Sequence, residues 1–143
     1  MRALWTDEVV EFHGKWHHID RAGINPRPVQ RPIPVWMGGY ADAVLRRTAA
    51  LADGWMPLFR PGEDASKQMT QQLKQYVREA GRNDADFGIE RRINLGGSNP
   101  EDWGREMDEW RALGATHVGV STPAELAPDD HVAMVRRFKE LVR

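Results

Sequence analysis

Short runs typical of strands alternate with longer amphipathic stretches along this chain, and this alternation limits its possible folds more than any other feature. The runs occupy residues 33–37, 55–59, 87–95 and 116–121. After each run, apolar residues recur at spacings of three and four, which is the pattern of one face of a helix. Repeated strand-then-helix units are typical of a parallel sheet covered by helices. We therefore predict an α/β fold with four successive βα units.

The helices predicted from these spacings run from about residues 42 to 52, 66 to 80, 100 to 113 and 129 to 142. Asn99 is predicted to cap the third helix, with Pro100 at its first position, where a missing N–H matters least. The residues predicted to face the core along the helices are Val44, Leu45, Thr48, Leu51, Ala52, Met69, Leu73, Tyr76, Val77, Ala80, Trp103, Met107, Trp110, Leu113, Val132, Val135, Phe138 and Val142.

The first part of the chain lacks this alternation. Residues 1–12 are interpreted as the end of a helix, with Leu4 and Phe12 on its apolar side. Residues 13–32 contain three prolines and two glycines, which make regular structure hard to sustain. We expect a long irregular connection there, and long connections in compact domains are often functional.

The chain length bounds the architecture. The 143 residues fit a single domain spanning residues 1–143. Four βα units suit either a doubly wound open sheet or half of a (β/α)₈ barrel, a TIM-type fold. A complete barrel typically needs about 250 residues, so in the second case this chain forms a partial barrel preceded by a helix end and a long loop.

Charge and composition narrow the classes of partner. The chain has 20 basic and 21 acidic residues and a net charge of −1, so nothing favours nucleic acid or a membrane surface as partner. It has no cysteine, which excludes disulfides and thiolate chemistry and fits a reducing cytoplasm. No apolar run approaches the ~18 residues of a transmembrane helix. We therefore expect a cytoplasmic protein.

Five segments of the chain form a set that is more specific than any one of them. They are Leu4–Glu8, Val10–Trp16, Pro26–Gly39, Ala52–Trp55 and Leu113–Val120. Together they resemble the luciferase-like monooxygenase superfamily, and within it the class that uses coenzyme F420. The resemblance implies a TIM-like barrel that binds F420 or FMN at the C-terminal ends of its strands. It also implies that these four strands are the second half of the barrel and that the catalytic residues, which the family draws largely from the first half, lie outside this chain.

The first strand-like run ends in Gly38 and Gly39, just before a predicted helix. Two glycines let a phosphate approach the backbone closely, and the N-terminus of a helix offers unpaired N–H groups. The resemblance implies that this turn binds the cofactor phosphate, with Tyr40 and Ala41 lining it through backbone N–H groups. A tight turn that needs positive φ explains the same two glycines. Asp42 fits a phosphate site only if its carboxylate faces away.

Two pairs of residues elsewhere are further candidates. Phe59 ends the second predicted strand and Arg60 follows it, and at that end of a barrel they can face the cofactor or its acidic tail. Arg91 and Arg92 alternate faces on the third strand, so one of them is expected to point inward while the other meets solvent.

Two turns remain open between a binding and a structural interpretation. Gly96–Asn99 is either a second anion-contacting loop or an N-cap with two flexible glycines. Ser121 and Thr122 either donate hydrogen bonds to a phosphate or cap the last turn. At the opposite ends of the strands, Asp53–Trp55 is expected to serve stability, because the bottom of a barrel lies away from the chemistry.

The histidines are not expected to bind a metal. His13, His17 and His18 fall in the long connection, where adjacent histidines of an extended chain point in different directions, whereas metal ligands must converge. His117 lies within a predicted strand, and a structural role is expected for it.

Two functions remain open. The first is an oxidoreductase, or its cofactor-binding half, in which F420, with FMN as the alternative, carries out hydride transfer or oxygenation of a small organic substrate. The second is a non-catalytic half-barrel that acts only as an association module. A four-stranded parallel sheet has two unpaired edges, so we expect a homo-oligomer or a partner chain that covers them.

Overall fold

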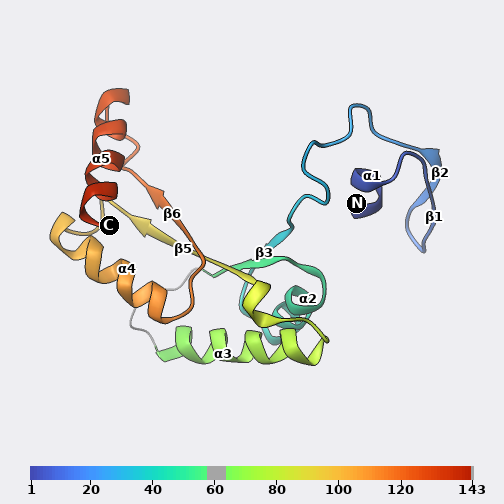
Figure 1. Cartoon of the computed structure of the whole chain (residues 1–143), viewed down its shortest axis with the longest axis horizontal. Coiled ribbons are helices and arrows are strands. Elements are labelled where there is room, and N and C mark those ends of the chain that lie inside the picture. The colour runs from blue at the N-terminus through green and yellow to red at the C-terminus, as the bar shows by residue number, and fades with distance from the viewer. Residues whose placement is uncertain (58–63, 143) are drawn as a thin grey trace. The chain divides into compact units, whose positions relative to one another are not determined.

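Figure 1 shows a computed structural model of the chain, which describes residues 1–57 and 64–142. The chain forms two compact units, Met1–Val35 and Trp36–Arg143, which we describe separately. Within the described residues, no helix combines the length and the apolar character that crossing a bilayer requires.

The first unit contains a short helix and an antiparallel hairpin. Helix α1 spans Arg2–Thr6, and strands β1 (Val10–His13) and β2 (His18–Ala22) pair in antiparallel register. The prediction of a helix end over residues 1–12 is therefore wrong for β1. The prediction of an irregular connection over residues 13–32 is wrong for β2.

The hairpin lacks the apolar alternation from which strands are predicted. Val10 is the one buried residue of the two strands, and Phe12 is half exposed. The Gly14 N–H donates to the His17 carbonyl at 2.8 Å, and this contact closes the turn. The two strands are held together by main-chain hydrogen bonds. These bonds require no alternation of apolar and polar residues, so the sequence carries no periodic signal for the hairpin.

The second unit is built on a parallel sheet of four strands. These are β3 (Trp36–Gly38), β4 (Gly54–Met56), β5 (Gly88–Asn94) and β6 (His117–Ser121), and their order in space follows their order in the chain. A doubly wound sheet reverses its strand order at a switch point, whereas a barrel adds each strand beside the last. The topology therefore confirms the partial barrel. β3 begins later than predicted, at Trp36 rather than Ile33, because the preceding prolines cannot donate to a ladder.

Each strand is followed by one of four helices, coloured from teal to red in Figure 1. They are α2 (Asp42–Leu51), α3 (Asp64–Glu79), α4 (Trp103–Ala112) and α5 (Pro128–Leu141). Two short 3₁₀ turns, η1 (Asp84–Asp86) and η2 (Pro100–Asp102), precede β5 and α4. All four predicted helices are confirmed. Asn99 occupies the N-cap position of η2 with Pro100 in its first turn, although the Asn99 side chain makes no capping hydrogen bond.

The core lies between the sheet and these helices, in two clusters. The first comprises Leu45, Ala49, Trp55, Leu73, Tyr76, Val77, Phe87 and Ile89. The second comprises Ile93, Leu95, Trp103, Met107, Trp110 and Phe138. The three tryptophans of these clusters are essentially inaccessible to solvent, so the helix layer supplies most of the apolar burial that stabilises this unit.

Four residues predicted to face the core are exposed instead. Leu51 and Ala80 lie at helix ends, beyond the packed stripe. Val132 and Val135 of α5 are also exposed. The packed residues of α5 are Met134, Phe138 and Val142, so the apolar stripe of this helix is rotated by about one position from the one predicted.

The sheet has a second face, directed away from the helices, which we call the inner face because it corresponds to the interior of a barrel. From the strand register and alternation, it comprises Trp36, Gly38, Gly54, Met56, Gly88, Glu90, Arg92, Asn94, His117, Gly119 and Ser121. Trp36 lies across this face: a Cβ added to Gly54 or Gly88 would collide with its indole. The His117 ring meets the same indole edge-on, with centroids 4.9 Å apart.

Candidate functional site

A cavity of about 250 Å³ lies where β3 and β4 end, beside the middle of β5. It is lined by Gly38, Gly39, Met56, Pro57, Glu90, Arg91 and Arg92. In (β/α)₈ barrels this end of the strands carries the active site. The cavity therefore brings two of the predicted site residues, Gly38 and Gly39, to the expected end of the fold.

The turn between β3 and α2 is shaped by its two glycines. Gly39 has φ +103°, and a Cβ there would lie 3.1 Å from Cγ1 of Val44. The Trp55 indole N–H donates to the Gly39 carbonyl at 2.7 Å, so the turn is fixed by the core beneath it. The prediction that positive φ explains the pair is confirmed for Gly39. The positive φ of Gly39 does not argue against a binding role, because the same turn also borders the cavity.

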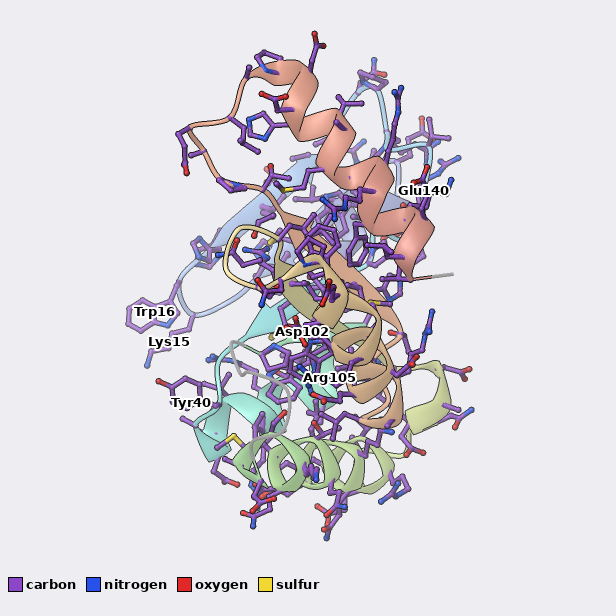
Figure 2. The ribbon with its side chains drawn as sticks, turned by 90° about the vertical axis from the view of Figure 1, so that its left-hand side faces the viewer. Lys15, Trp16, Tyr40, Asp102, Arg105 and Glu140 are labelled. Atoms are coloured by element: carbon purple, nitrogen blue, oxygen red, sulfur yellow. The ribbon has the colours of Figure 1, made fainter. Side chains whose placement is uncertain are left out.

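Helix α2 begins next to this turn without a side-chain cap. Ala41 is its N-cap and provides no side-chain acceptor for the first N–H groups of the helix, which have no acceptor within the helix itself. Tyr40 is 60% exposed, and Figure 2 shows its ring at the periphery of the molecule. Neither residue lines the cavity. Phe59 and Arg60 lie outside the described residues.

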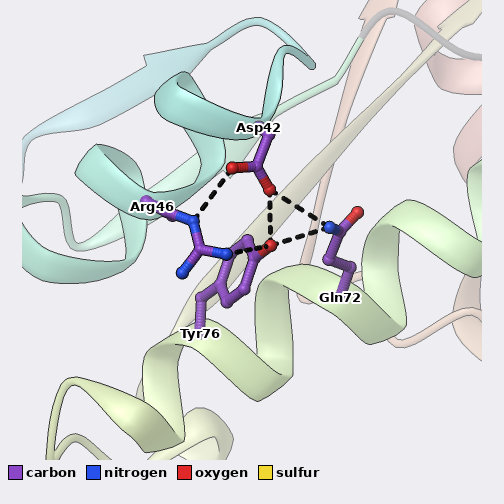
Figure 3. Close-up of polar contacts among 4 residues, drawn as sticks. All are labelled: Asp42, Arg46, Gln72 and Tyr76. Atoms are coloured by element: carbon purple, nitrogen blue, oxygen red, sulfur yellow. Dashed lines mark hydrogen bonds and ion pairs between the residues drawn. The ribbon is translucent and has the colours of Figure 1, made fainter.

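Asp42, the first residue of α2, is directed toward α3 (Figure 3) and is not among the residues that line the cavity. Its carboxylate accepts hydrogen bonds from the Tyr76 hydroxyl at 2.5 Å, from Arg46 Nε at 2.9 Å and from Gln72 Nε2 at 3.3 Å. Arg46 Nη2 and Gln72 Nε2 both donate to the Tyr76 oxygen, at 2.9 and 2.8 Å. The Tyr76 hydrogen bond, followed by that of Arg46, lowers the pKa of the Asp42 carboxyl. A carboxylate engaged in this way is held apart from an anion at the glycine turn.

Arg91 and Arg92 point to opposite faces of β5, as predicted. Arg91 is 1% exposed and lies on the helix side, whereas Arg92 lies on the inner face with its side chain 66% exposed. Arg92 Nη2 lies 4.0 Å from Glu90 Oε1, and both residues line the cavity. Arg92 is thus an exposed cation at this site that the predicted cofactor contacts omitted. Strand alternation in the sequence predicts its position on the face opposite Arg91.

The two turns left open by the sequence are occupied by internal contacts. Asn94 Oδ1 accepts from the Gly96 N–H at 3.1 Å, and Ser98 Oγ donates to the Asn94 carbonyl at 3.3 Å. At the end of β6, Thr122 Oγ1 lies 2.6 Å from His131 Nδ1 of α5. These contacts favour the structural interpretation of both turns.

The residues at the other end of the strands have structural contacts. Gly54 is buried beneath Trp36, and Trp55 is fully buried in the core. Besides its contact with Trp36, the His117 Nδ1 lies 2.9 Å from Thr116 Oγ1. In the hairpin, His13 and His18 approach each other with 3.4 Å between their Nδ1 atoms. Across residues 1–57 and 64–142, no group of three or more His, Cys, Asp or Glu is arranged to hold a metal ion.

Comparison with known sequences matches residues 1–139 to the luciferase-like monooxygenase family. An F420-dependent glucose-6-phosphate dehydrogenase of Nakamurella multipartita is 26% identical over 96% of this chain and 48% of its own length. An uncharacterised protein of Mycobacterium tuberculosis (strain ATCC 25618 / H37Rv) is 30% identical over 96% of this chain and 46% of its own length. The chain thus spans about half the length of these curated relatives.

Solved structures share the fold. An F420-dependent secondary alcohol dehydrogenase in complex with an F420–acetone adduct superposes with a TM-score of 0.75, at 15% identity, over 99% of this chain and 58% of that chain. A coenzyme F420-dependent tetrahydromethanopterin reductase from Methanopyrus kandleri gives a TM-score of 0.71 with the same identity and coverage. At 15% sequence identity, these superpositions show that the fold is shared and nothing more.

Proposed function

Because the chain belongs to the luciferase-like monooxygenase family, we propose that it binds coenzyme F420 and forms the cofactor-binding half of an F420-dependent oxidoreductase. The observation that carries this proposal is the glycine turn at the end of β3, which borders a cavity together with Arg92. Two curated relatives that match 96% and 89% of this chain are F420-dependent glucose-6-phosphate dehydrogenases, which supports F420 over FMN.

The turn suits a phosphate group on steric and electrostatic grounds. Gly38 and Gly39 present no Cβ, so an anion can approach the main chain closely. The uncapped N-terminus of α2 supplies N–H groups and the positive end of a helix dipole. The Asp42 carboxylate is engaged by Tyr76 and Arg46, so it does not compete for the same N–H groups.

When bound, F420 supplies the hydride chemistry at its deazaflavin ring, and the residues of this chain bind and orient it. The Arg92 guanidinium would attract the phosphate or the acidic tail of the cofactor. Glu90 opposes such an anion, although Arg92 compensates part of its charge at 4.0 Å. Trp36, packed over Gly54 and Gly88, fills the lower end of the inner face and keeps water from it.

A fluorescence titration of the purified chain with F420, and with FMN for comparison, tests the proposal. The informative variant is Gly39→Ala, and Gly81→Ala is its matched control. Both glycines have positive φ, +103° and +72°, but a Cβ at Gly81 would meet nothing within 4 Å. Each substitution should lower the free energy of unfolding by about 1–2 kcal/mol through backbone strain.

Only Gly39→Ala should also weaken F420 binding, by about tenfold or more. Equal F420 affinity in Gly39→Ala and the wild-type chain would contradict the proposal that the cofactor phosphate binds at this turn. A folded wild-type chain that binds neither cofactor would overturn the proposal that this half binds F420. Tighter binding of FMN than of F420 would mean that the cofactor is FMN, and the proposed binding site would stay the same.

The strand edges favour a second role, in association. The four-stranded sheet ends at β3 on one side and β6 on the other, and among the described residues neither edge has a further hydrogen-bonded neighbour. We propose that these edges pair with a second copy of the chain or with a partner chain. A single monomeric species in sedimentation at micromolar concentration, with native circular dichroism, would contradict this.

A further inference from the structure

Helix α2 carries an acidic residue, Asp42, in its first turn. The N-cap residue, Ala41, offers no side-chain acceptor, and the first N–H groups of a helix have no acceptor within the helix. A carboxylate in the first turn ordinarily interacts favourably with these groups and with the positive end of the helix dipole. Asp42 therefore has a favourable position available at the same N–H groups that the proposed function assigns to the cofactor phosphate.

The Asp42 carboxylate is bound to α3 instead of the start of its own helix (Figure 3). Oδ1 accepts from the Tyr76 hydroxyl and from Gln72 Nε2, and Oδ2 accepts from Arg46 Nε. Arg46 Nη2 and Gln72 Nε2 also reach the Tyr76 oxygen, and both of these nitrogens can only donate. The single hydroxyl proton of Tyr76 is therefore directed to Asp42, and both carboxylate oxygens are engaged.

Tyr76 is the member of this network that the core holds in place. Its side chain packs in the same buried cluster as Leu45 of α2 and is 9% exposed, whereas the side chains of Asp42 and Arg46 are each 57% exposed. An exposed ion pair between residues four apart on a helix is worth only about 0.3–0.5 kcal/mol, so Arg46 alone holds the carboxylate weakly. The position of the Asp42 carboxylate thus depends on the Tyr76 hydroxyl.

The pKa shifts of the two groups agree with this geometry. The hydrogen bond from Tyr76 is the largest cause of the lowered pKa of Asp42. The same hydrogen bond is the largest cause of the raised pKa of Tyr76. Both directions are those of a phenol that donates to an ionised carboxylate, so Asp42 carries its negative charge at neutral pH.

We infer that Tyr76 is a positioning residue for the anion site at the glycine turn. By holding the Asp42 carboxylate against α3, it leaves the N-terminal N–H groups of α2 accessible to the phosphate of a ligand. This inference rests on the proposed function, and Tyr76 acts through Asp42 without touching the ligand. When the hydroxyl is removed, the carboxylate can turn to the start of its own helix, where it occupies these N–H groups and repels a phosphate.

Fluorescence titration with F420 tests this inference in the whole chain. Tyr76→Phe keeps the packed ring and removes only the hydroxyl, and Gln75→Ala, at an exposed position of α3, is the control. We expect F420 to bind about threefold to tenfold more weakly to Tyr76→Phe and with unchanged affinity to Gln75→Ala. The double variant Tyr76→Phe/Asp42→Asn should bind F420 as tightly as Asp42→Asn alone, because the competing charge is gone. A purely structural role of the hydroxyl would weaken binding in both backgrounds.

An NMR measurement without cofactor follows the carboxylate itself. In Tyr76→Phe at neutral pH, the Ala43 N–H resonance should move downfield, and the Asp42→Asn background should abolish that change. An unchanged Ala43 resonance would overturn the inference. A wild-type chain that binds no F420 would overturn the proposed function together with this inference. Wild-type F420 affinity in Tyr76→Phe, or a loss of affinity that Asp42→Asn does not rescue, would overturn this inference alone.

Discussion

The two faces of the parallel sheet differ in composition: one packs apolar side chains against the helices, and the other presents mostly glycine and polar residues. The helix-facing side buries Trp55, Trp103 and Trp110 together with aliphatic side chains. The inner face is rich in glycine and polar groups, and one aromatic side chain, Trp36, lies over Gly54 and Gly88. The helix-facing side has the volume and the apolar character of a core. The inner face has small residues where a ligand or an aromatic ring must come close.

The difference between the faces shows where substitutions should affect stability and where they should affect binding. On the helix-facing side the apolar residues contribute through the surface that they remove from water. On the inner face, steric fit to Trp36 dominates at one end of the strands. Charge and main-chain access dominate at the other end, where Gly39 and Arg92 line the cavity.

The largest effect is expected from truncating the helix-facing core. Trp55→Ala should lower the free energy of unfolding by about 3–5 kcal/mol, because it leaves a cavity under β4 and removes the indole donor to Gly39. Trp16→Ala is the matched control, since Trp16 is 77% exposed, and it should change stability by no more than about 0.5 kcal/mol. Urea unfolding measures both. A Trp55 effect as small as that of Trp16 would mean that the helix-facing side is not the dominant core.

An intermediate effect is expected where the inner face is packed by a single ring. Gly88→Ala should cost about 1–3 kcal/mol of unfolding free energy, because the new Cβ collides with Trp36. The same substitution at Gly104 of α4, where a Cβ would lie 3.5 Å from the Leu141 carbonyl, should be neutral or stabilising. Adding Trp36→Ala should relieve the collision. Strictly additive losses in that double-mutant cycle would show that the ring does not lie over Gly88.

The sequence predicts the helix-facing side well, because burial against a layer of helices leaves a regular period. Strand alternation on β5 likewise assigns Arg91 and Arg92 to opposite faces from their positions in the sequence. The inner face is harder to predict, because the position of Trp36 depends on glycines from two other strands. The hairpin of β1 and β2 has no apolar period. The contact between Asp42 and Tyr76 joins residues 34 positions apart, and no sequence pattern predicts that these two side chains meet.

The smallest effect is expected from the network that joins α2 to α3, and it depends on pH. Tyr76→Phe removes the largest cause of the lowered pKa of Asp42, so that pKa should move back toward the ordinary value of 3.8. A carboxyl whose pKa is lowered in the folded state stabilises that state above its unfolded pKa, and this contribution is lost as the pH falls through the folded pKa. Wild type should therefore be more stable than Tyr76→Phe at neutral pH, and the two should converge below about pH 3.8. Urea unfolding of both proteins from pH 7 to pH 2.5 measures this. A difference that is constant over the whole range would assign the role of Tyr76 to packing, and it would leave Asp42 free to oppose an anion at the neighbouring turn.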